Sequence, residues 1–141
     1  MKYTKIVAEV VSEIKRQLNM QISCYPCCRP AAAGEKCHVI LDNFKLVRHR
    51  KRAKIYFNYY ISVEYRFKKG YDYCHTSGCQ EIEVPPDIRL CPCSHTLTYT
   101  TACKDLMVIN QRKIQLSITI NFTILTCRPQ IITVRQQITR E

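Results

Sequence analysis

The sequence has no tryptophan, only three glycines and few acidic residues for its length of 141. Eleven Asp and Glu stand against 22 Lys and Arg, which gives a formal net charge of +11. A surface this cationic attracts anionic polymers, membranes or acidic proteins, but it determines no fold. With glycine scarce, and with Ile, Val, Thr and nine Tyr prominent, the composition favours β-strands.

Long apolar segments are also lacking. No run approaches the roughly 18 to 20 apolar residues that a membrane-spanning helix needs. Residues 1–13 mix charges with apolar side chains, and they show neither the apolar centre nor the small-residue cleavage site of a signal peptide. We therefore expect no membrane segment and synthesis without a signal peptide. The length suits a single domain.

The usual signatures of enzymes are missing as well. The sequence contains no nucleophile elbow, phosphate-binding loop or dinucleotide fingerprint. Cys37-His38 and Cys74-His75 are sequence neighbours, but neighbours on a strand point to opposite faces, so they make poor nucleophile pairs. We expect a protein that is not an enzyme, with no catalytic residue, no cofactor and no metal ligand assigned.

Two long stretches alternate strictly between apolar and other side chains, which indicates half-buried strands. In residues 54–65 the odd positions are apolar or aromatic, and from Lys113 onward the even positions are apolar. We predict that these faces form the core: Ile55, Phe57, Tyr59, Ile61, Val63 and Tyr65 in the first stretch, and Ile114, Leu116, Ile118, Ile120, Phe122 and Ile124 in the second.

The remaining segments complete an all-β prediction. Residues 131–138 alternate again and predict one more strand after Pro129, while Pro, Gly or clustered Cys mark loops at residues 25–34, 68–78, 85–86 and 91–93. The first twenty residues fit either a strand or a helical stripe. The fold expected is an antiparallel, two-sheet β-sandwich, jelly-roll-like, with an extended or helical N-terminal segment. We divide it into an N-terminal strand or arm with a Cys-rich loop, residues 1–37, and a sandwich core, residues 38–141.

Ten cysteines indicate a disulfide framework, a metal site or both. Only Cys24-x-x-Cys27 has the spacing usual for zinc, and no second such pair completes a set of four ligands. A zinc-stabilised nucleic-acid-binding protein therefore stays as the remoter alternative.

Disulfides are the main interpretation of the cysteines. The adjacent Cys27 and Cys28, and Cys91 and Cys93 on an extended chain, cannot bridge within their pair without strain. Surplus cysteines in exposed loops suit links between subunits, although all ten could also pair internally. Candidates for intermolecular bonds are Cys24, Cys27, Cys28, Cys91 and Cys93. Candidates for intramolecular bonds are Cys37, Cys74, Cys79, Cys103 and Cys127, with Cys74 and Cys79 placed to close a local loop.

A run of basic residues separates two apolar stretches near the middle of the chain. Like charges need solvent, so the run predicts an exposed turn rather than a nucleic-acid patch. This basic surface turn consists of Arg48, Arg50, Lys51, Arg52 and Lys54. The main alternative function uses it: a monomeric basic module that attaches to an anionic surface polymer.

Scattered motifs over most of the chain resemble the SPOCS domain, a module of bacterial spore coat and spore morphogenesis proteins. The resemblance lies in Val10-Val-Ser-Glu13, Gln17, Gln21-Ile22, residues 39–47, Lys54-Ile55 with the strand to Tyr65, Glu81-Ile-Glu-Val84 and residues 106–125. The sequence departs from the pattern by the cysteines at 24–28, 74–79 and 91–93, and by the lack of a cell-wall-binding module.

The resemblance implies an all-β fold and a structural role on the bacterial endospore. It implies synthesis in the mother cell without a signal peptide, and a place in the coat, the exosporium or an appendage. An isolated domain with loop cysteines looks like a self-assembling subunit, akin to those of endospore appendage fibres. The expected partners are further copies of the chain, in a homopolymer, and other spore coat proteins, with no nucleic acid and no membrane. The choice between a fibre and a coat layer stays open.

Overall fold

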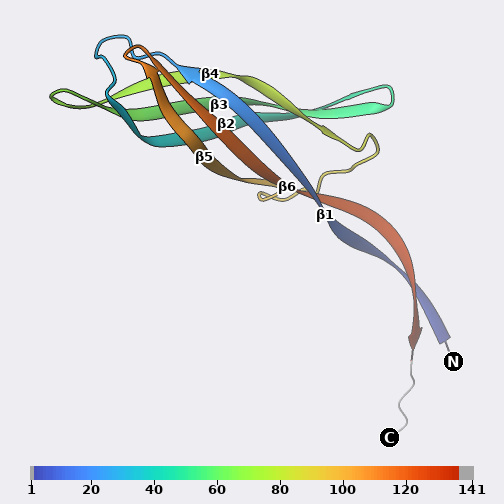
Figure 1. Cartoon of the computed structure of the whole chain (residues 1–141). Coiled ribbons are helices and arrows are strands. Elements are labelled where there is room, and N and C mark those ends of the chain that lie inside the picture. The colour runs from blue at the N-terminus through green and yellow to red at the C-terminus, as the bar shows by residue number, and fades with distance from the viewer. Residues whose placement is uncertain (1, 137–141) are drawn as a thin grey trace, which may run out of the picture.

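The computed structural model describes residues 2–136, and these contain six β-strands and no helix (Figure 1). The strands are β1 (Lys2–Cys24), β2 (Ala33–His49), β3 (Arg52–Phe67), β4 (Gly70–Val84), β5 (Leu97–Asn110) and β6 (Lys113–Gln136). They form two antiparallel sheets of three strands each, in the orders β1-β6-β5 and β2-β3-β4. The prediction of an all-β, two-sheet antiparallel protein is confirmed.

The core lies between the central strands of the two sheets, β3 and β6. Phe57 of β3 and Phe122 of β6 meet across the interface with ring centroids 5.3 Å apart. The predicted alternation is confirmed, because the six even positions of β6 are fully buried and the odd positions of β3 point inward with them. Tyr59 is the exception on β3, being half-buried at the edge of the core.

The N-terminal segment is a strand, and the helical alternative is not supported. β1 pairs with β6 without interruption from Lys2 opposite Gln136 to Cys24 opposite Ile114. This ladder pairs one side of the β1 backbone along the whole strand. At the end of β1, residues Met20, Ile22 and Cys24 bury their side chains in the core. β2 begins at Ala33 and runs through position 37, where the sequence-based division was placed.

Several predicted loops and ends differ in the structure. Residues 70–78, expected as a loop, belong to β4 and pair with β3, which leaves only a tight turn after Phe67. The basic turn shrinks to Arg50 and Lys51 between β2 and β3, with Arg50 at a positive φ of 57°. The predicted last strand is the continuation of β6 past Pro129, and positions 137 and 138 of that prediction lie outside the described residues.

β6 passes through Pro129 without losing a ladder bond. The amides of Leu125 and Cys127 donate toward the β5 side of β6, to Thr96 and Arg89. Residues two apart on a strand direct their backbone groups to the same side. The nitrogen of Pro129 therefore faces the same side, where no strand pairs with it among residues 2–136, so its missing N–H costs nothing.

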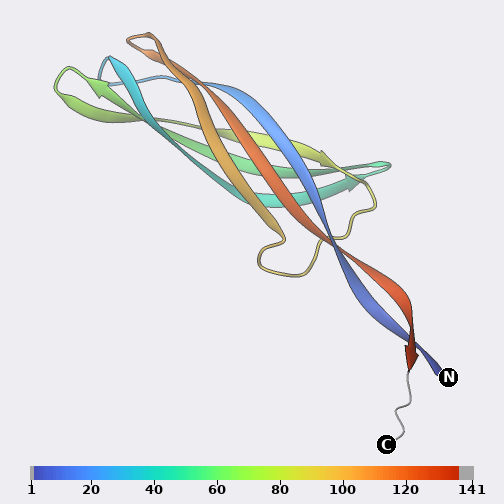
Figure 2. The same ribbon diagram turned by 60° about the horizontal axis from the view of Figure 1, so that its bottom comes forward.

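Beyond Leu97, where β5 begins, β1 and β6 continue together as a two-stranded ribbon that projects from the sheets (Figures 1 and 2). We define the ribbon as Lys2–Val11 paired with Cys127–Gln136. It carries exposed apolar side chains, with exposed fractions of 65% for Tyr3, 59% for Val11 and 68% for Ile131. These side chains have no core of their own to enter.

A charge placed in the shared core should unfold the protein. Ile118 is fully buried, so Ile118→Asp should abolish cooperative melting, because a buried unpaired charge costs several kcal/mol against a total stability of about 5 to 15 kcal/mol. The matched control is Asn121→Asp on the exposed face of the same strand, which should melt like the wild type. Thermal unfolding followed by circular dichroism measures both. Wild-type melting of Ile118→Asp would contradict this core.

Candidate functional site

Cys37 of β2 and Cys103 of β5 form a disulfide, with their Cα atoms 6.2 Å apart. β2 and β5 are edge strands of different sheets, so this bond joins the sheets along one side. Leu106 of β5 packs over Gly34 of β2 on the same side, where a Cβ on the glycine would collide with the leucine. A disulfide and a close apolar contact together close this side of the core.

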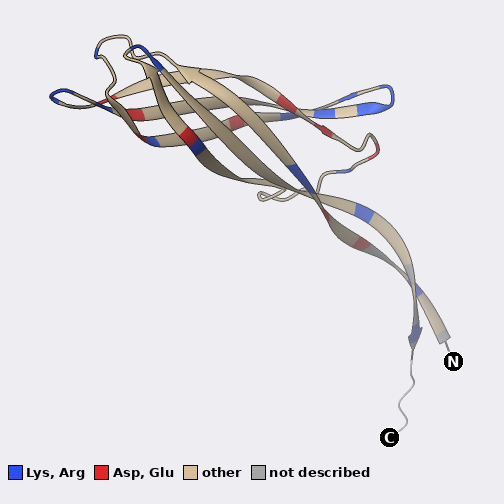
Figure 3. Ribbon diagram, viewed as in Figure 1, with Lys and Arg blue, Asp and Glu red and all other residues tan. Residues whose placement is uncertain are grey.

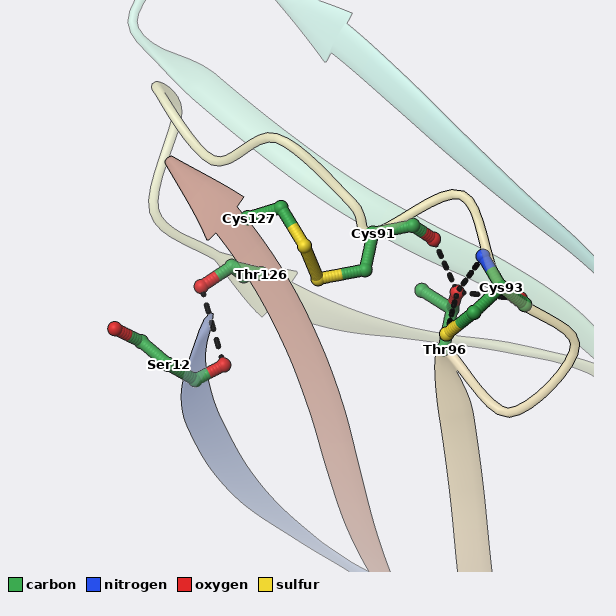
Figure 4. Close-up of a disulfide and its surroundings, with 6 residues drawn as sticks. All are labelled: Ser12, Cys91, Cys93, Thr96, Thr126 and Cys127. Atoms are coloured by element: carbon green, nitrogen blue, oxygen red, sulfur yellow. Dashed lines mark hydrogen bonds between the residues drawn. A yellow bond between two sulfur atoms is a disulfide. The ribbon is translucent and has the colours of Figure 1, made fainter. Parts of the chain in front are cut away.

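A second disulfide, Cys91–Cys127, fixes the connection between β4 and β5 onto β6 (Figure 4). The Cα atoms are 4.8 Å apart, and two backbone hydrogen bonds flank the bond: Cys91 donates to the Leu125 carbonyl and Cys127 to the Arg89 carbonyl. The connection thereby lies beside β6 in line with β5, and it covers that side of β6 up to the base of the ribbon. Next to it, the Thr96 hydroxyl donates to the Cys93 carbonyl at 2.7 Å.

These bonds correct part of the cysteine assignment. Cys91, expected to link subunits, is bonded to Cys127 because the 85–96 connection folds back onto β6. Cys24, expected in an exposed loop, is fully buried at the end of β1. Cys74 and Cys79 do not close a loop: they are five residues apart on one strand and point to opposite faces. The intramolecular candidates Cys37, Cys103 and Cys127 all lie in disulfides.

Four exposed thiols remain, and two of them are adjacent. Cys27, Cys28, Cys79 and Cys93 are exposed and outside both disulfides. The Cys79 thiol donates to the Asn58 side chain at 3.1 Å, and the Cys93 sulfur lies 3.3 Å from the Thr96 hydroxyl. The Cys27 and Cys28 sulfurs lie 3.2 Å apart, and the hydrogen bond and charge of Cys27 raise the pKa of Cys28. Either thiol can attack a disulfide as its thiolate.

The loop that carries Cys27 and Cys28, residues 25–32, is held by contacts with side chains of β3 and with the turn before β6. The Tyr65 hydroxyl donates to the Arg29 carbonyl at 3.1 Å, and the Arg29 guanidinium lies 5.1 Å from the centroid of the Phe67 ring. Burial raises the pKa of Tyr65 to about 12, so it stays a hydrogen-bond donor at neutral pH. The Ala31 amide also donates to the Gln111 carbonyl. The anchors hold the two thiols at the surface, at the end of β1 opposite to the ribbon (Figure 1).

Lys and Arg residues gather at the hairpin between β2 and β3 (Figure 3). Some of them form contacts within the chain and others are exposed. Lys54 forms an ion pair with Glu81 at 2.8 Å, and this hydrogen bond raises the pKa of Lys54 and lowers that of Glu81. The Arg48 guanidinium donates to the Ile88 carbonyl. At the tip, Arg50, Lys51 and Arg52 are exposed and form no ion pair with the described part of the chain. The cationic site is therefore the hairpin tip.

The ribbon presents backbone groups that no strand of the described chain uses. Because the odd residues of β6 direct their amides toward the β5 side, its even residues face β1 and pair with even residues there, as Ser12 with Thr126. The odd residues of β1 therefore direct their N–H and C=O groups away from β6. Among them are Lys5 and Glu9, whose side chains are exposed. This free edge is a template on which another strand can pair.

Residues 2–136 contain neither a metal-binding cluster nor a helix that could span a membrane. Between residues 2 and 136, no group of three or more His, Cys, Asp or Glu side chains is arranged to hold a metal ion. No helix long and apolar enough to cross a membrane occurs in that range.

The comparisons with known proteins give no relative. The chain matches no protein-family model, and no curated protein or solved structure is similar to it.

The disulfide between β2 and β5 should contribute strongly to stability. Its cysteines are 66 residues apart in sequence, and closing a loop of that length removes enough unfolded-state entropy to stabilise a fold by about 4 kcal/mol. Cys37→Ala/Cys103→Ala should lower the free energy of unfolding in urea by about that amount. Cys79→Ala, which removes an exposed thiol, is the control and should have little effect. Equal stability of the two variants would show that the disulfide does not form.

Proposed function

We propose that this protein is a structural, self-assembling subunit, cross-linked by disulfides, in a bacterial endospore surface layer or appendage fibre. In this proposal the two sheets are the layers of a β-sandwich, and the protein is not an enzyme. The single observation that carries the proposal is the ribbon, which exposes apolar side chains together with a free strand edge. A monomeric domain has no use for such an element, whereas a subunit that pairs with its neighbours requires one.

The ribbon edge fits a second copy of itself. When two β1 strands pair antiparallel with a two-fold axis beside residue 7, Lys5 of each copy lies opposite Glu9 of the other. In the same register the exposed Tyr3 lies opposite Val11. Directly opposed pairs of opposite charge, and pairs of aromatic and β-branched side chains, stabilise antiparallel strands by roughly 0.2 to 1 kcal/mol each. The two-fold axis makes every such contact twice, which is the property of an isologous interface.

The opposite end of the subunit supplies the covalent contact. The anchored loop holds Cys27 and Cys28 on the surface at the end of β1 that is remote from the ribbon tip. A disulfide between the loops of two subunits, added to ribbon pairing at the other end, joins each copy to two neighbours. Repetition of these two contacts gives a linear polymer. Its covalent links resist dilution and denaturant, as the surface of a dormant cell requires.

The endospore location rests on the resemblance to the SPOCS domain. Such proteins are made in the mother cell, and their thiols can oxidise during maturation or after release of the spore. Both cross-linking and a cysteine-rich chain fit that setting. Further copies of the chain are the main partner, and other spore coat proteins are additional candidates.

A second candidate function is favoured by the basic hairpin tip. Arg50, Lys51 and Arg52 project together and lack acidic partners within residues 2–136, so they suit an anionic surface polymer. In this alternative the protein is a monomeric binding module. The two functions differ in their oligomeric state, which the following experiments measure.

Reversal of one ribbon charge should break the association, and reversal of both should restore it. Lys5→Glu places two like-charged pairs across the two-fold axis, so the dissociation constant should rise about tenfold or more at low salt. Lys5→Glu/Glu9→Lys exchanges the charges and should recover wild-type association. Lys45→Glu, an equal charge change on β2, is the control. Sedimentation equilibrium in the presence of reductant measures all four proteins. A monomeric wild type would favour the monomeric module, and a double variant that stays dissociated would rule out this register.

Oxidation should then link the associated subunits in covalent pairs. Oxidised wild-type protein should run as a dimer in hot detergent without reductant, because the ribbon contact is not covalent, and as a monomer with reductant. Cys27→Ser/Cys28→Ser should lose the dimer band, while Cys79→Ser should keep it, because Cys79 lies on β4 away from the anchored loop. A single monomer band from oxidised wild type would exclude the cross-linked subunit.

A further inference from the structure

Two buried thiols, Cys24 and Cys74, meet in the core from opposite sheets. Cys24 ends β1 and Cys74 lies on β4, and their exposed fractions are 0% and 5%. The strands that carry them are in contact, because the Arg16 guanidinium of β1 donates to the Glu83 carbonyl of β4 at 3.0 Å. Both cysteines belong to the same buried cluster, and neither takes part in a disulfide of the structure. Free cysteines pack in apolar cores as small hydrophobic side chains, so the reactivity of the two thiols is the property to consider here.

In one of the two sheets this pair lies at the edge opposite to the Cys37–Cys103 disulfide. In the sheet β2-β3-β4, Val63 of β3 pairs with Cys37 on one side and with Cys74 on the other. Cys37 and Cys74 thus lie in one cross-strand row, on the two edge strands. Cys37 is bonded to Cys103 on β5, and Cys74 contacts Cys24 on β1. β5 and β1 are in turn the two edges of the other sheet.

We propose that Cys24 and Cys74 are oxidised to a third intramolecular disulfide, which joins β1 to β4 and closes the second open side between the sheets. The two inter-sheet disulfides would then hold all four edge strands, β2 to β5 and β1 to β4. The bond lies within one chain, so the proposal stands or falls independently of the proposed assembly.

The chemistry requires an oxidant, and a small disulfide such as oxidised glutathione supplies it. The hydrogen bond from Cys74 lowers the pKa of Cys24, so Cys24 is the thiol that ionises and attacks first. It bonds to one sulfur of the small disulfide and releases the other as a thiol. Cys74 gives up its proton, attacks the Cys24 sulfur and displaces the second small thiol. The protein loses two protons and two electrons, and one small disulfide becomes two thiols.

Burial determines when the bond can form. The hydrogen bond with Cys24, together with burial, raises the pKa of Cys74, which makes it a poor nucleophile in the closed core. Oxidation therefore belongs to folding, before the sheets close over both sulfurs, or to transient opening of β1 from β4. Once formed, the bond is protected from reductants by the same burial.

The test uses the full chain with its exposed thiols removed. In the variant Cys27→Ser/Cys28→Ser/Cys79→Ser/Cys93→Ser, ten cysteines minus four leave six, which are the two disulfides and the buried pair. The protein is refolded in a mixture of oxidised and reduced glutathione, denatured in acid and alkylated. We expect no alkylated cysteine and a proteolytic fragment that links Cys24 to Cys74. Adding Cys24→Ala to this variant should leave Cys74 as the single alkylated residue.

Stability provides the second measurement. A loop of about 50 residues closed by the bond should lower the equilibrium constant of unfolding roughly a hundredfold to a thousandfold, relative to the same variant with Cys24→Ala/Cys74→Ala. Alkylation of both Cys24 and Cys74 in the parent variant would overturn the proposal. A fragment that links either residue to Cys37, Cys91, Cys103 or Cys127 would overturn it equally.

Discussion

The narrowness of the two sheets is the constraint on which the rest of this structure depends. Each sheet has one central strand, β3 or β6, and these two strands supply most of the buried side chains, including the Phe57–Phe122 contact. Every other strand is an edge. An edge strand buries one face at most and leaves a row of backbone groups without a partner. The Cys37–Cys103 disulfide and the packing of Leu106 on Gly34 join two of these edges. The projecting ribbon instead leaves an edge uncovered.

The edges differ in how they are covered, and the exposed and reactive groups of the protein lie where this difference places them. On the β2–β5 side a covalent bond closes the core, and on the β1–β4 side two thiols meet. Along β6, the Cys91–Cys127 bond brings the 85–96 connection against the strand and covers its edge as far as the base of the ribbon. Past that point the chain offers no further covering segment within the described residues. The part of the molecule suited to a partner is the part that its own strands leave uncovered.

The central strands could be predicted from the sequence because their environment is uniform. Along residues 55–65 and 114–124 one face packs in the core and the other is more exposed, so the sequence alternates. β4 was missed because it is an edge strand with a polar middle, His75 to Gly78, which reads as a loop. The start of β1 is ambiguous in the sequence because apolar residues such as Tyr3, Ile6 and Val11 are exposed there, so burial does not set a clear alternation. Tertiary pairing with β6, which the local pattern does not contain, decides its structure.

The cysteines show the same division between local and distant information. The exposed position of Cys27, Cys28 and Cys93 follows from their loops and could be predicted. The pairing of Cys91 with Cys127 depends on the path of a connection across another strand, which sequence spacing does not record. The burial of Cys24 had a readable signal, because Met20, Ile22 and Cys24 continue one alternating apolar face. The spacing Cys24-x-x-Cys27, by contrast, is also typical of a metal site.

Pro129 makes the two edges of the ribbon different from each other. It lies on the β6 edge, where its ring occupies the position of an amide and interrupts the row of donors that an incoming strand would need. The β1 edge of the ribbon has no proline between Lys2 and Val11. A ribbon that could recruit strands on both sides would add copies without limit and grow into an amyloid-like sheet. With one side obstructed, strand addition ends after a single partner, so any longer growth of the polymer has to come from another part of the surface.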